Sequence, residues 1–440
     1  VLIEEERHAR LIGDVEQRVT CIGALTRTLP PAAREPVVSR MLAAIADGTG
    51  GRRSGRSLAA LAPVAAAGQL DRMADALSTV QGLERARAAA ALFAANARLG
   101  RWDRALGFLP ELDNGHHLRL ALDQLPEEVP AEVVRTILRG AADTADAELG
   151  ATAIAPLARR LPEDEREAAC ELGLQAAEVL RLPDRYRLLE ALIPAIPCER
   201  LDAASALISD DDHNALMERD GALVALAVRR GDCGDLPTAI SILDRMTYVD
   251  ARCRACVQWC GRTGLPEEIR FRFLEWAETF ADGESNYMRV ELLAEVARQH
   301  TEPHRSRLLE KALALARAIK KSSKSFVVSA NVDTALALAS LAPLVDASRQ
   351  ADIMLEAWDR AADAGTERAR GLEAVAPLVA TLGPDRIAAR WRNQLERVLG
   401  ERRDVLAELE VMAPVIERLG GEDGVLGVIA AIETTARWWP

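Results

Sequence analysis

Apolar side chains recur every three to four positions along almost the whole chain, and polar or charged residues lie between them. This spacing places the apolar side chains on one face of an α-helix, whereas a half-buried strand would show strict alternation. Ala, Leu, Arg and Glu, all strong helix formers, dominate the sequence. Runs of β-branched and aromatic residues bounded by turns, which are typical of strands, are missing. The pattern therefore predicts an all-α protein.

A phrase of the form Ala-Leu-x-x-Leu-Ala-Pro recurs within this helical pattern. It ends at Pro63, Pro156, Pro194, Pro343, Pro377 and Pro414, and degenerate copies without the proline fit at Arg27, Ala97, Asp123, Val228, Gly261 and Arg298. The copies are 26 to 45 residues apart, with a mean of about 35. Such a unit holds two helices of roughly 13 residues and two short turns, and it buries its apolar face only by stacking on its neighbours. We expect the recurring proline to kink or end the first helix of each unit, because its ring clashes with the preceding turn.

These repeats predict one continuous right-handed α-solenoid of about eleven or twelve helix pairs. By this prediction, residues 1–19 form an N-terminal helix that continues from an upstream region, and the repeats cover residues 20–420. Residues 421–440 are expected to form a C-terminal capping helix. The chain starts at Val1 rather than at a methionine, so we expect that it was cut from a larger protein.

One stretch matches a named repeat in more detail. In residues 94–109, Gly100 is followed by Trp102, Ala105 and Leu109, and this order resembles the middle of a tetratricopeptide repeat (TPR). In that motif the glycine allows a tight turn, the aromatic ring wedges between helices, and the alanine permits close helix approach. The repeated phrasing over residues 20–420 is also similar to the TPR- and HEAT-like arms of bacterial NLR-like (STAND) signal-transduction NTPases. The resemblance implies a recognition arm that senses a protein or peptide and relays this to a covalently linked NTPase or effector domain.

The charge and the cysteine content narrow the possible classes of protein further. The chain holds 55 basic and 67 acidic residues, a formal net charge of −12, which argues against general binding to nucleic acid or to anionic membranes. No apolar run is long enough to span a membrane, and no signal peptide is visible. Seven cysteines at irregular spacing are typical of reduced, buried thiols. We therefore expect a cytoplasmic protein. Only four residues are lysine, and three of these lie in the basic, Ser-rich segment 320–325 of the longest repeat interval.

A glycine-rich basic segment, residues 50–57, differs by one letter from the phosphate-binding motif G-x-x-x-x-G-K-[S/T]. Arg56 occupies the lysine position, and no strand precedes the loop, so the favoured interpretation is a basic loop between repeats. An anion held by Arg52, Arg53 and Arg56 at a helix start is the alternative.

Cys253, Cys256 and Cys260 share one helical face, and Cys233 is nearby in the sequence. Zinc bound by these four thiolates is one reading. A packed apolar helix face is the favoured one, because Cys256 and Cys260 align with core positions of another repeat.

Other polar clusters have simpler explanations. His300 and His304 flank Pro303, so a solvated turn is favoured over a metal pair, and Asp210–Asp212 are read as a turn and helix N-cap. His8, His116 and His117 are expected at the surface. Among the tryptophans, Trp102, Trp259, Trp276 and Trp358 are expected in the core. Trp391, Trp438 and Trp439 are expected to be exposed or, for the last two, to cap the final apolar face.

No catalytic triad or acid–base set can be assembled from the sequence. We therefore favour a non-enzymatic protein- or peptide-recognition module without a cofactor, plausibly the ligand-sensing arm of a larger bacterial defence or signalling protein. The candidate contacts are Arg52, Arg53, Arg56, Lys320, Lys321, Lys324, Trp391, Trp438 and Trp439. The alternatives are an all-α enzyme with its site in a repeat cavity and a scaffold that oligomerises through Trp438 and Trp439.

Overall fold

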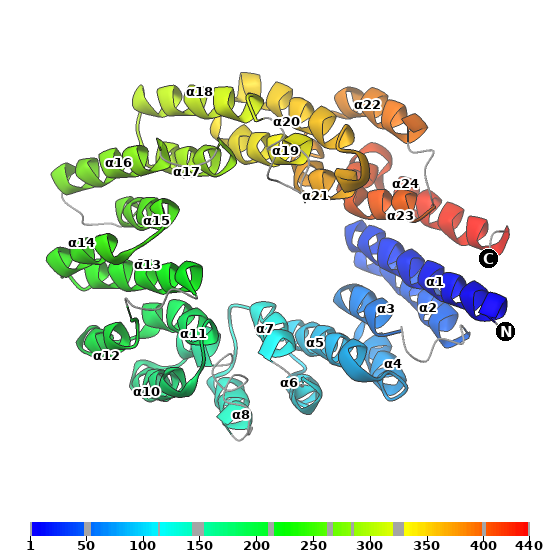
Figure 1. Cartoon of the computed structure of the whole chain (residues 1–440). Helices are drawn as coiled ribbons and strands as arrows, with labels where there is room; N and C mark the ends of the chain where they lie inside the picture. Colours follow the sequence, from blue (N-terminus) through cyan, green and yellow to red (C-terminus); the bar gives the residue numbers. More distant parts are fainter. Residues whose placement is uncertain are drawn as a thin grey trace. The chain divides into compact units, whose positions relative to one another are not determined.

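The computed structural model describes residues 2–47, 54–112, 115–142, 154–209, 215–261, 267–282, 286–319, 330–397 and 402–438. Within these ranges every regular element is an α-helix or a short 3₁₀-helix (Figure 1). Within the two units described below, many consecutive helices pack on one another. The prediction of an all-α, repeat-like helical array is confirmed.

The chain forms two compact units. Unit 1 combines Val1–Leu112 with Ile319–Pro440, and unit 2 is Asp113–Ala318. The α-helices of unit 1 are α1 (Leu2–Thr28), α2 (Pro31–Asp47), α3 (Ser54–Leu61), α4 (Ala67–Leu77), α5 (Gly82–Arg98), α6 (Trp102–Leu106), α19 (Ala330–Leu341), α20 (Ala347–Ala362), α21 (Arg368–Val379), α22 (Pro384–Arg397), α23 (Arg402–Val411) and α24 (Ala413–Trp438). Within α24 the backbone leaves the helical conformation at Gly421 (φ 58°), which divides that element into two segments.

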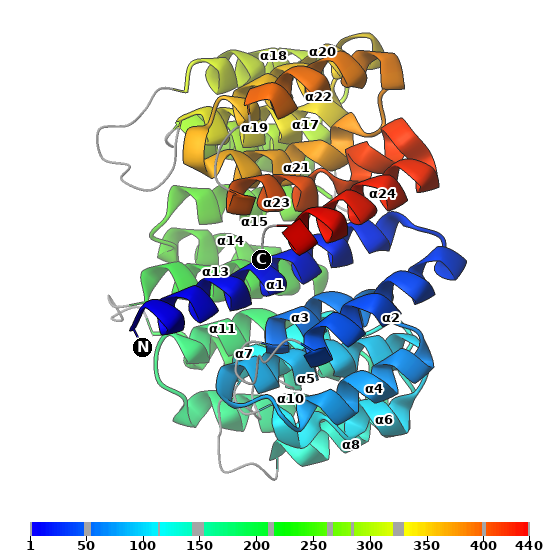
Figure 2. The same ribbon diagram turned by 90° about the vertical axis from the view of Figure 1, so that its right-hand side faces the viewer.

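The core of unit 1 joins the two ends of the chain. Helix α1 packs against α23 and α24 as well as against α2 and α3, and Figure 2 shows α1 in blue beside α24 in red. Arg40 on α2 also forms an ion pair with Glu433 on α24 at 3.1 Å. Burial, aided by the nearby Glu410 on α23, raises the pKa of the Cys21 thiol on α1 to about 12. The first and last helices therefore share one apolar core.

The α-helices of unit 2 are α7 (Gly115–Asp123), α8 (Ala131–Ala142), α10 (Glu163–Val179), α11 (Asp184–Leu192), α12 (Leu201–Ala206), α13 (Leu216–Asp232), α14 (Leu236–Arg245), α15 (Val249–Cys260), α16 (Glu267–Asp282), α17 (Asn286–Gln299) and α18 (His304–Arg317). Residues 154–158 are also helical. Helices α11, α13, α15 and α17 pack in succession. Trp259 on α15 lies in this core and stacks on Phe273 of α16 at 4.6 Å between ring centroids.

The recurring prolines end several α-helices. After α3, α11 and α19 the chain continues as 3₁₀ turns at Ala62–Val64, Ile193–Ala195 and Ala342–Leu344, each containing the proline of the repeated phrase. Proline has no N–H to donate to the carbonyl four residues earlier, so the last turn tightens instead of continuing as an α-helix. At these three sites the proline therefore ends the α-helix rather than kinking it.

Arginine side chains fasten successive helices of the array to one another. Several donate to a main-chain carbonyl 33 to 36 residues earlier, and these pairs are Arg101 with Ala67, Arg160 with Pro126, Arg229 with Ile196, and Arg418 with Leu382. The accepting carbonyls lie at or just beyond the ends of elements: Ala67 is the first residue of α4, whereas Pro126, Ile196 and Leu382 follow α7, a 3₁₀ turn and α21. The guanidinium fork presents several N–H donors and is well shaped to satisfy such carbonyls. We call these contacts arginine clamps, and they give a physical reason for the excess of arginine over lysine.

The segment that resembles a tetratricopeptide repeat has the local geometry that the motif requires. Gly100 has φ +70°, a left-handed conformation that favours glycine, and it ends α5. Ala105 on α6 is completely buried, whereas Trp102 is only half-buried. The turn and the close helix approach are therefore present, but the ring is not the fully buried wedge that we predicted.

Candidate functional site

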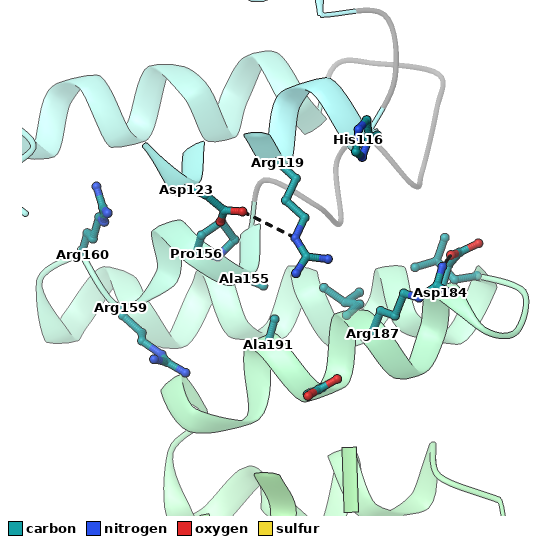
Figure 3. A pocket seen from close by; sticks show the side chains of 13 residues that line it. His116, Arg119, Asp123, Ala155, Pro156, Arg159, Arg160, Asp184, Arg187 and Ala191 are labelled. Atoms are coloured by element: carbon teal, nitrogen blue, oxygen red, sulfur yellow. Dashed lines mark hydrogen bonds and ion pairs between the residues drawn. The ribbon is translucent and has the colours of Figure 1, made fainter. Parts of the chain in front are cut away.

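A pocket of about 750 Å³ lies in unit 2 among α7, the helical residues 154–158, the end of α10, and α11 (Figure 3). Its lining is His116, Arg119, Asp123, Ala155, Pro156, Arg159, Arg160, Leu180, Asp184, Arg187, Leu188, Glu190 and Ala191. Small and apolar side chains alternate there with four arginines and three carboxylates. This mixture suits a ligand with both apolar and charged parts.

Two short helices border the pocket. Both α7 and α11 have nine residues, whereas the neighbouring α13 has 17. A 3₁₀ turn that contains Pro194 follows α11 directly, so that helix stops at Leu192. Among the small residues of the lining, Ala191 is exposed, Pro156 is half-buried and Ala155 is buried.

The four arginines of the pocket differ in how they are held. Arg160 donates to the Pro126 carbonyl at 2.9 Å, and burial lowers the pKa of its guanidinium. Arg187 is paired with Asp184 at 3.1 Å and with Glu218 at 2.9 Å. Arg119 lies 3.7 Å from Asp123, a long pair between exposed side chains, which Figure 3 marks with a dashed line.

Arg159 has the fewest polar contacts of these four arginines. It is exposed and has no hydrogen bond or ion pair with any residue that the structure describes. A guanidinium presents five N–H donors in a planar fork that matches a carboxylate or phosphate. Arg159 and the loosely held Arg119 are therefore the two groups of the pocket that can bind an anion without first losing a strong internal contact.

Glu190 adds a negative charge to the same pocket. It is exposed on α11 and has no ion pair among the described residues. Its carboxylate lies against the backbone of α13 at Gly221, where an added Cβ would come within 2.8 Å of Glu190 Oε2. A glycine at position 221 is therefore what allows α13 to pass so close to this carboxylate. The pocket thus holds both unpaired positive and unpaired negative charge.

The sequence did not single out these pocket residues. A comparison between units does distinguish one of them. Arg160 and Arg229 make equivalent clamp contacts, so Arg159 is equivalent in position to Val228. Val228 is buried at 5 % exposure. Arg159 is therefore charged where the equivalent residue two units later is apolar, and this difference becomes visible only once the clamp contacts are known.

The basic segments predicted as contacts are placed only in part. Arg52, Arg53, Lys320, Lys321 and Lys324 lie outside the described residues. Arg56 belongs to α3 and forms ion pairs with Glu16 at 3.2 Å and with Glu84 at 3.3 Å. Because two carboxylates already neutralise Arg56, it is a contact between α1, α3 and α5 rather than an open anion site.

The cysteines differ from the prediction at one pair. Cys233 forms a disulfide with Cys198, so the expectation that all seven thiols are reduced is wrong, and Cys233 does not join a zinc set. Cys253, Cys256 and Cys260 are buried in α15, where Cys253 donates to the Ala277 carbonyl and Cys260 to the Arg270 carbonyl. Burial raises the pKa of Cys256 to about 12 and that of Cys260 to about 11. In the part of the chain that is described, no group of three or more His, Cys, Asp or Glu is placed to hold a metal ion.

The aromatic predictions have mixed outcomes. Trp259 and Trp358 are buried as expected, whereas Trp276 is half-buried. Trp391 is half-buried rather than exposed, because its ring packs edge-to-face on Trp358 at 6.5 Å. Trp438 lies at the end of α24, where its side chain is not described, and Trp439 lies outside the described residues.

One histidine prediction is wrong and one holds in part. His117 is buried at 5 % exposure rather than at the surface. His300 does lie in the turn between α17 and α18, and residues 301–303 of that turn are exposed. The side chain of His300 itself is only 9 % exposed, however, and its ring stacks on His304. Nε2 of His300 lies 3.3 Å from Glu278 Oε1, and burial, the largest influence, lowers the pKa of this histidine.

Comparison with known proteins adds little. No family model and no curated protein matches the chain. A solved structure described as a circular tandem repeat protein with novel repeat topology and enhanced subunit contact surfaces aligns with 97 % of this chain and 98 % of its own, at 15 % identity and a TM-score of 0.19. The description of the fold therefore rests on the helices themselves. Among the described helices, none is long and apolar enough to cross a membrane.

Proposed function

We propose that the chain is a non-enzymatic protein- or peptide-recognition module and that the arginine pocket of unit 2 is its contact site. The observation that carries the proposal is the contrast among the arginines. Arg101, Arg160, Arg229 and Arg418 donate to main-chain carbonyls. Arg159, by contrast, is exposed beside a small apolar floor and has no partner among the residues that the structure describes. A cation that the fold does not use is available for a partner.

The surroundings of the pocket favour a polypeptide over a small metabolite. Exposed apolar side chains adjoin its lining in the sequence: Leu120 next to Arg119, and Val179 next to Leu180. Met217, 71 % exposed, precedes the Glu218 that pairs with Arg187. Exposed apolar side chains in or next to the elements that form the pocket are available for the larger contact area that a polypeptide, unlike a small ligand, would cover.

The distribution of shifted carboxylates supports a binding role over the enzymatic alternative. Burial raises the pKa of Glu295, Asp333 and Glu410. These three lie on α17, α19 and α23, none lines the pocket, and none perturbs another. An acid–base site would place such groups together around a substrate.

We also propose that the array is a right-handed α-solenoid with a unit of about 35 residues. The arginine clamps support the period, because their partners are 33 to 36 residues apart. An experimental structure at a resolution that shows helix direction would test both the hand and the period.

The sensor-arm role is a further part of the proposal. It rests on the resemblance of the repeats to NLR-like arms, in which ligand binding is relayed to an attached NTPase. The sequence encoded upstream of Val1 tests it: an NTPase or nuclease domain there supports the role, and an unrelated enzyme contradicts it.

Selection from a random-peptide display library on the immobilised intact chain tests the recognition function. We expect peptides that bind the chain and lose binding when Arg119 and Arg159 are both replaced by alanine. Arg104→Ala is the matched control, since Arg104 is similarly exposed (70 % against 65 % for Arg119) and loosely paired, at 3.9 Å from Asp71. No enrichment above an unrelated protein would contradict the function, and enriched peptides that bind the double variant equally would contradict the site.

A further inference from the structure

The charges of the pocket point to one kind of ligand, and this inference rests on the proposed function. We propose that the pocket binds an extended peptide segment in which a single acidic side chain is flanked by small or apolar residues, and that Glu190 rejects segments with several adjacent negative charges.

The acidic side chain follows from the two available cations. Arg119 and Arg159 extend from α7 and from the segment after residue 158, and Figure 3 shows Arg159 and Arg187 on either side of Ala191. The chain as a whole carries a net charge of −12. Arg119 is exposed and only loosely paired with Asp123, and the exposed Arg159 has no partner among the described residues. These two guanidiniums are a local source of positive charge, and a carboxylate is the peptide group that matches them.

The flanking residues follow from the floor. Pro156 and Ala191 offer small apolar contacts, with the buried Ala155 also in the lining, and the half-buried Pro156 has no N–H to donate to a ligand. Leu188 and Leu180 complete the apolar part of the lining. Burial against such a floor is favourable for apolar side chains of a bound peptide. Charged side chains of the peptide would find no partner there.

The restriction to one negative charge follows from the carboxylates. Asp123 and Asp184 are paired with arginines of the pocket, but Glu190 is not paired with any described residue. A second acidic side chain, or the double charge of a phosphate, would face this unneutralised carboxylate. Like charges placed across a contact cost affinity and provide specificity.

Fluorescence anisotropy with the intact chain tests the inference. The probe is a labelled peptide of sequence Gly-Leu-Ala-Glu-Ala-Leu-Gly, and its companions replace the glutamate with glutamine, with phosphoserine, or with three successive glutamates. We expect the single-glutamate peptide to bind roughly tenfold or more tightly than the glutamine peptide, because charge-assisted hydrogen bonds to guanidinium are lost with the charge. Arg119→Ala and Arg159→Ala should each remove most of that difference, and Arg104→Ala should not.

Glu190→Gln provides the specificity test. The variant should raise the affinity for the tri-glutamate peptide several-fold and leave the single-glutamate peptide nearly unchanged. The inference is overturned if the glutamine peptide binds as tightly as the glutamate peptide, if the phosphoserine peptide binds tenfold more tightly, or if none of the four peptides binds. In those cases the library selection still decides the recognition function, because enriched peptides without an acidic residue would preserve the function and reject only the ligand class.

Discussion

The stretch that ends at Arg160 and the end of α13 show the same clamp in two different settings. Arg160 donates to a carbonyl 34 residues earlier, and Arg229 does so across 33 residues. The residue before the clamp is exposed Arg159 in the first and buried Val228 in the second. Arg159 and Arg160 lie in the turn that follows the helical residues 154–158, beside the pocket, whereas Val228 and Arg229 lie within a 17-residue helix that packs against α11 and α15. The clamp therefore holds two helical units together in both regions. Only in the first is it preceded by a charged side chain that has no partner among the described residues.

The largest effect is expected in the closed region. Arg219 on α13 is buried, contacts Asp220 at 3.3 Å, and donates to the Arg245 carbonyl and to Thr247 Oγ1. Replacing Arg219 with alanine leaves the buried Asp220 carboxylate without its cation, and we expect a loss of about 3–5 kcal/mol in the free energy of unfolding. Urea denaturation measures this, and a loss below about 1 kcal/mol would show that the closed region does not depend on its buried charges.

Replacing either clamp arginine, Arg160 or Arg229, should lower the free energy of unfolding by a similar amount. Arg160→Ala and Arg229→Ala each leave a main-chain carbonyl without its arginine donor, so each is expected to cost about 1–2 kcal/mol. Denaturation of both variants, with Arg139→Ala on α8 as an exposed control, tests whether the clamp is equally structural in the two regions. If Arg160→Ala were neutral, Arg160 would belong with Arg159 among the uncommitted groups.

Acidification should lower the stability of the fold through the buried His300 but not through the exposed His116. Burial holds the pKa of His300 below its ordinary value of 6.5, although Glu278 opposes this while His304, Arg307 and Arg270 add to it. Between the two values the unfolded chain binds more protons, so stability rises with pH up to about 6.5 and is lost as pH falls below it. His300→Gln should reduce this slope.

The free energy of unfolding measured between pH 5 and 7.5 provides the readout. His116→Gln is the control, because His116 is exposed at the pocket. An unchanged slope in His300→Gln would mean that His300 does not contribute to the acid sensitivity.

The smallest effect on stability is expected in the pocket itself. Replacing both Arg119 and Arg159 with alanine removes one long, exposed ion pair and one unpaired side chain. We expect a change within about 0.5 kcal/mol. A thermal or urea transition that shifts as far as that of the clamp variants would show that these arginines serve the fold.

Much of the architecture could be predicted from the sequence, because a helical hydrophobic period and regularly placed prolines are local signals. The 3₁₀ turns at Pro63, Pro194 and Pro343 follow from chemistry within one helical turn. The contact of α1 with α23 and α24 joins residues about 400 apart, and no local pattern encodes it.

The site was harder to predict for the same reason. Arg119, Arg159 and Arg187 come from three elements, and their neighbourhood depends on how short helices stack. The sequence directed attention to charge runs and terminal tryptophans, several of which lie outside the described residues. The useful information was which arginines have a main-chain partner, and only the three-dimensional structure shows that.

Hydrogen–deuterium exchange of the intact chain, with and without a library-selected peptide, tests the central claim most directly. The pocket account predicts that the peptide slows exchange in α7, in residues 154–160 and in α11, with little change in α15 to α18. It also predicts that the protection disappears in the Arg119→Ala, Arg159→Ala double variant. Protection confined to α15–α18, or unchanged protection in the double variant, would contradict the assignment of the arginine pocket as the contact site.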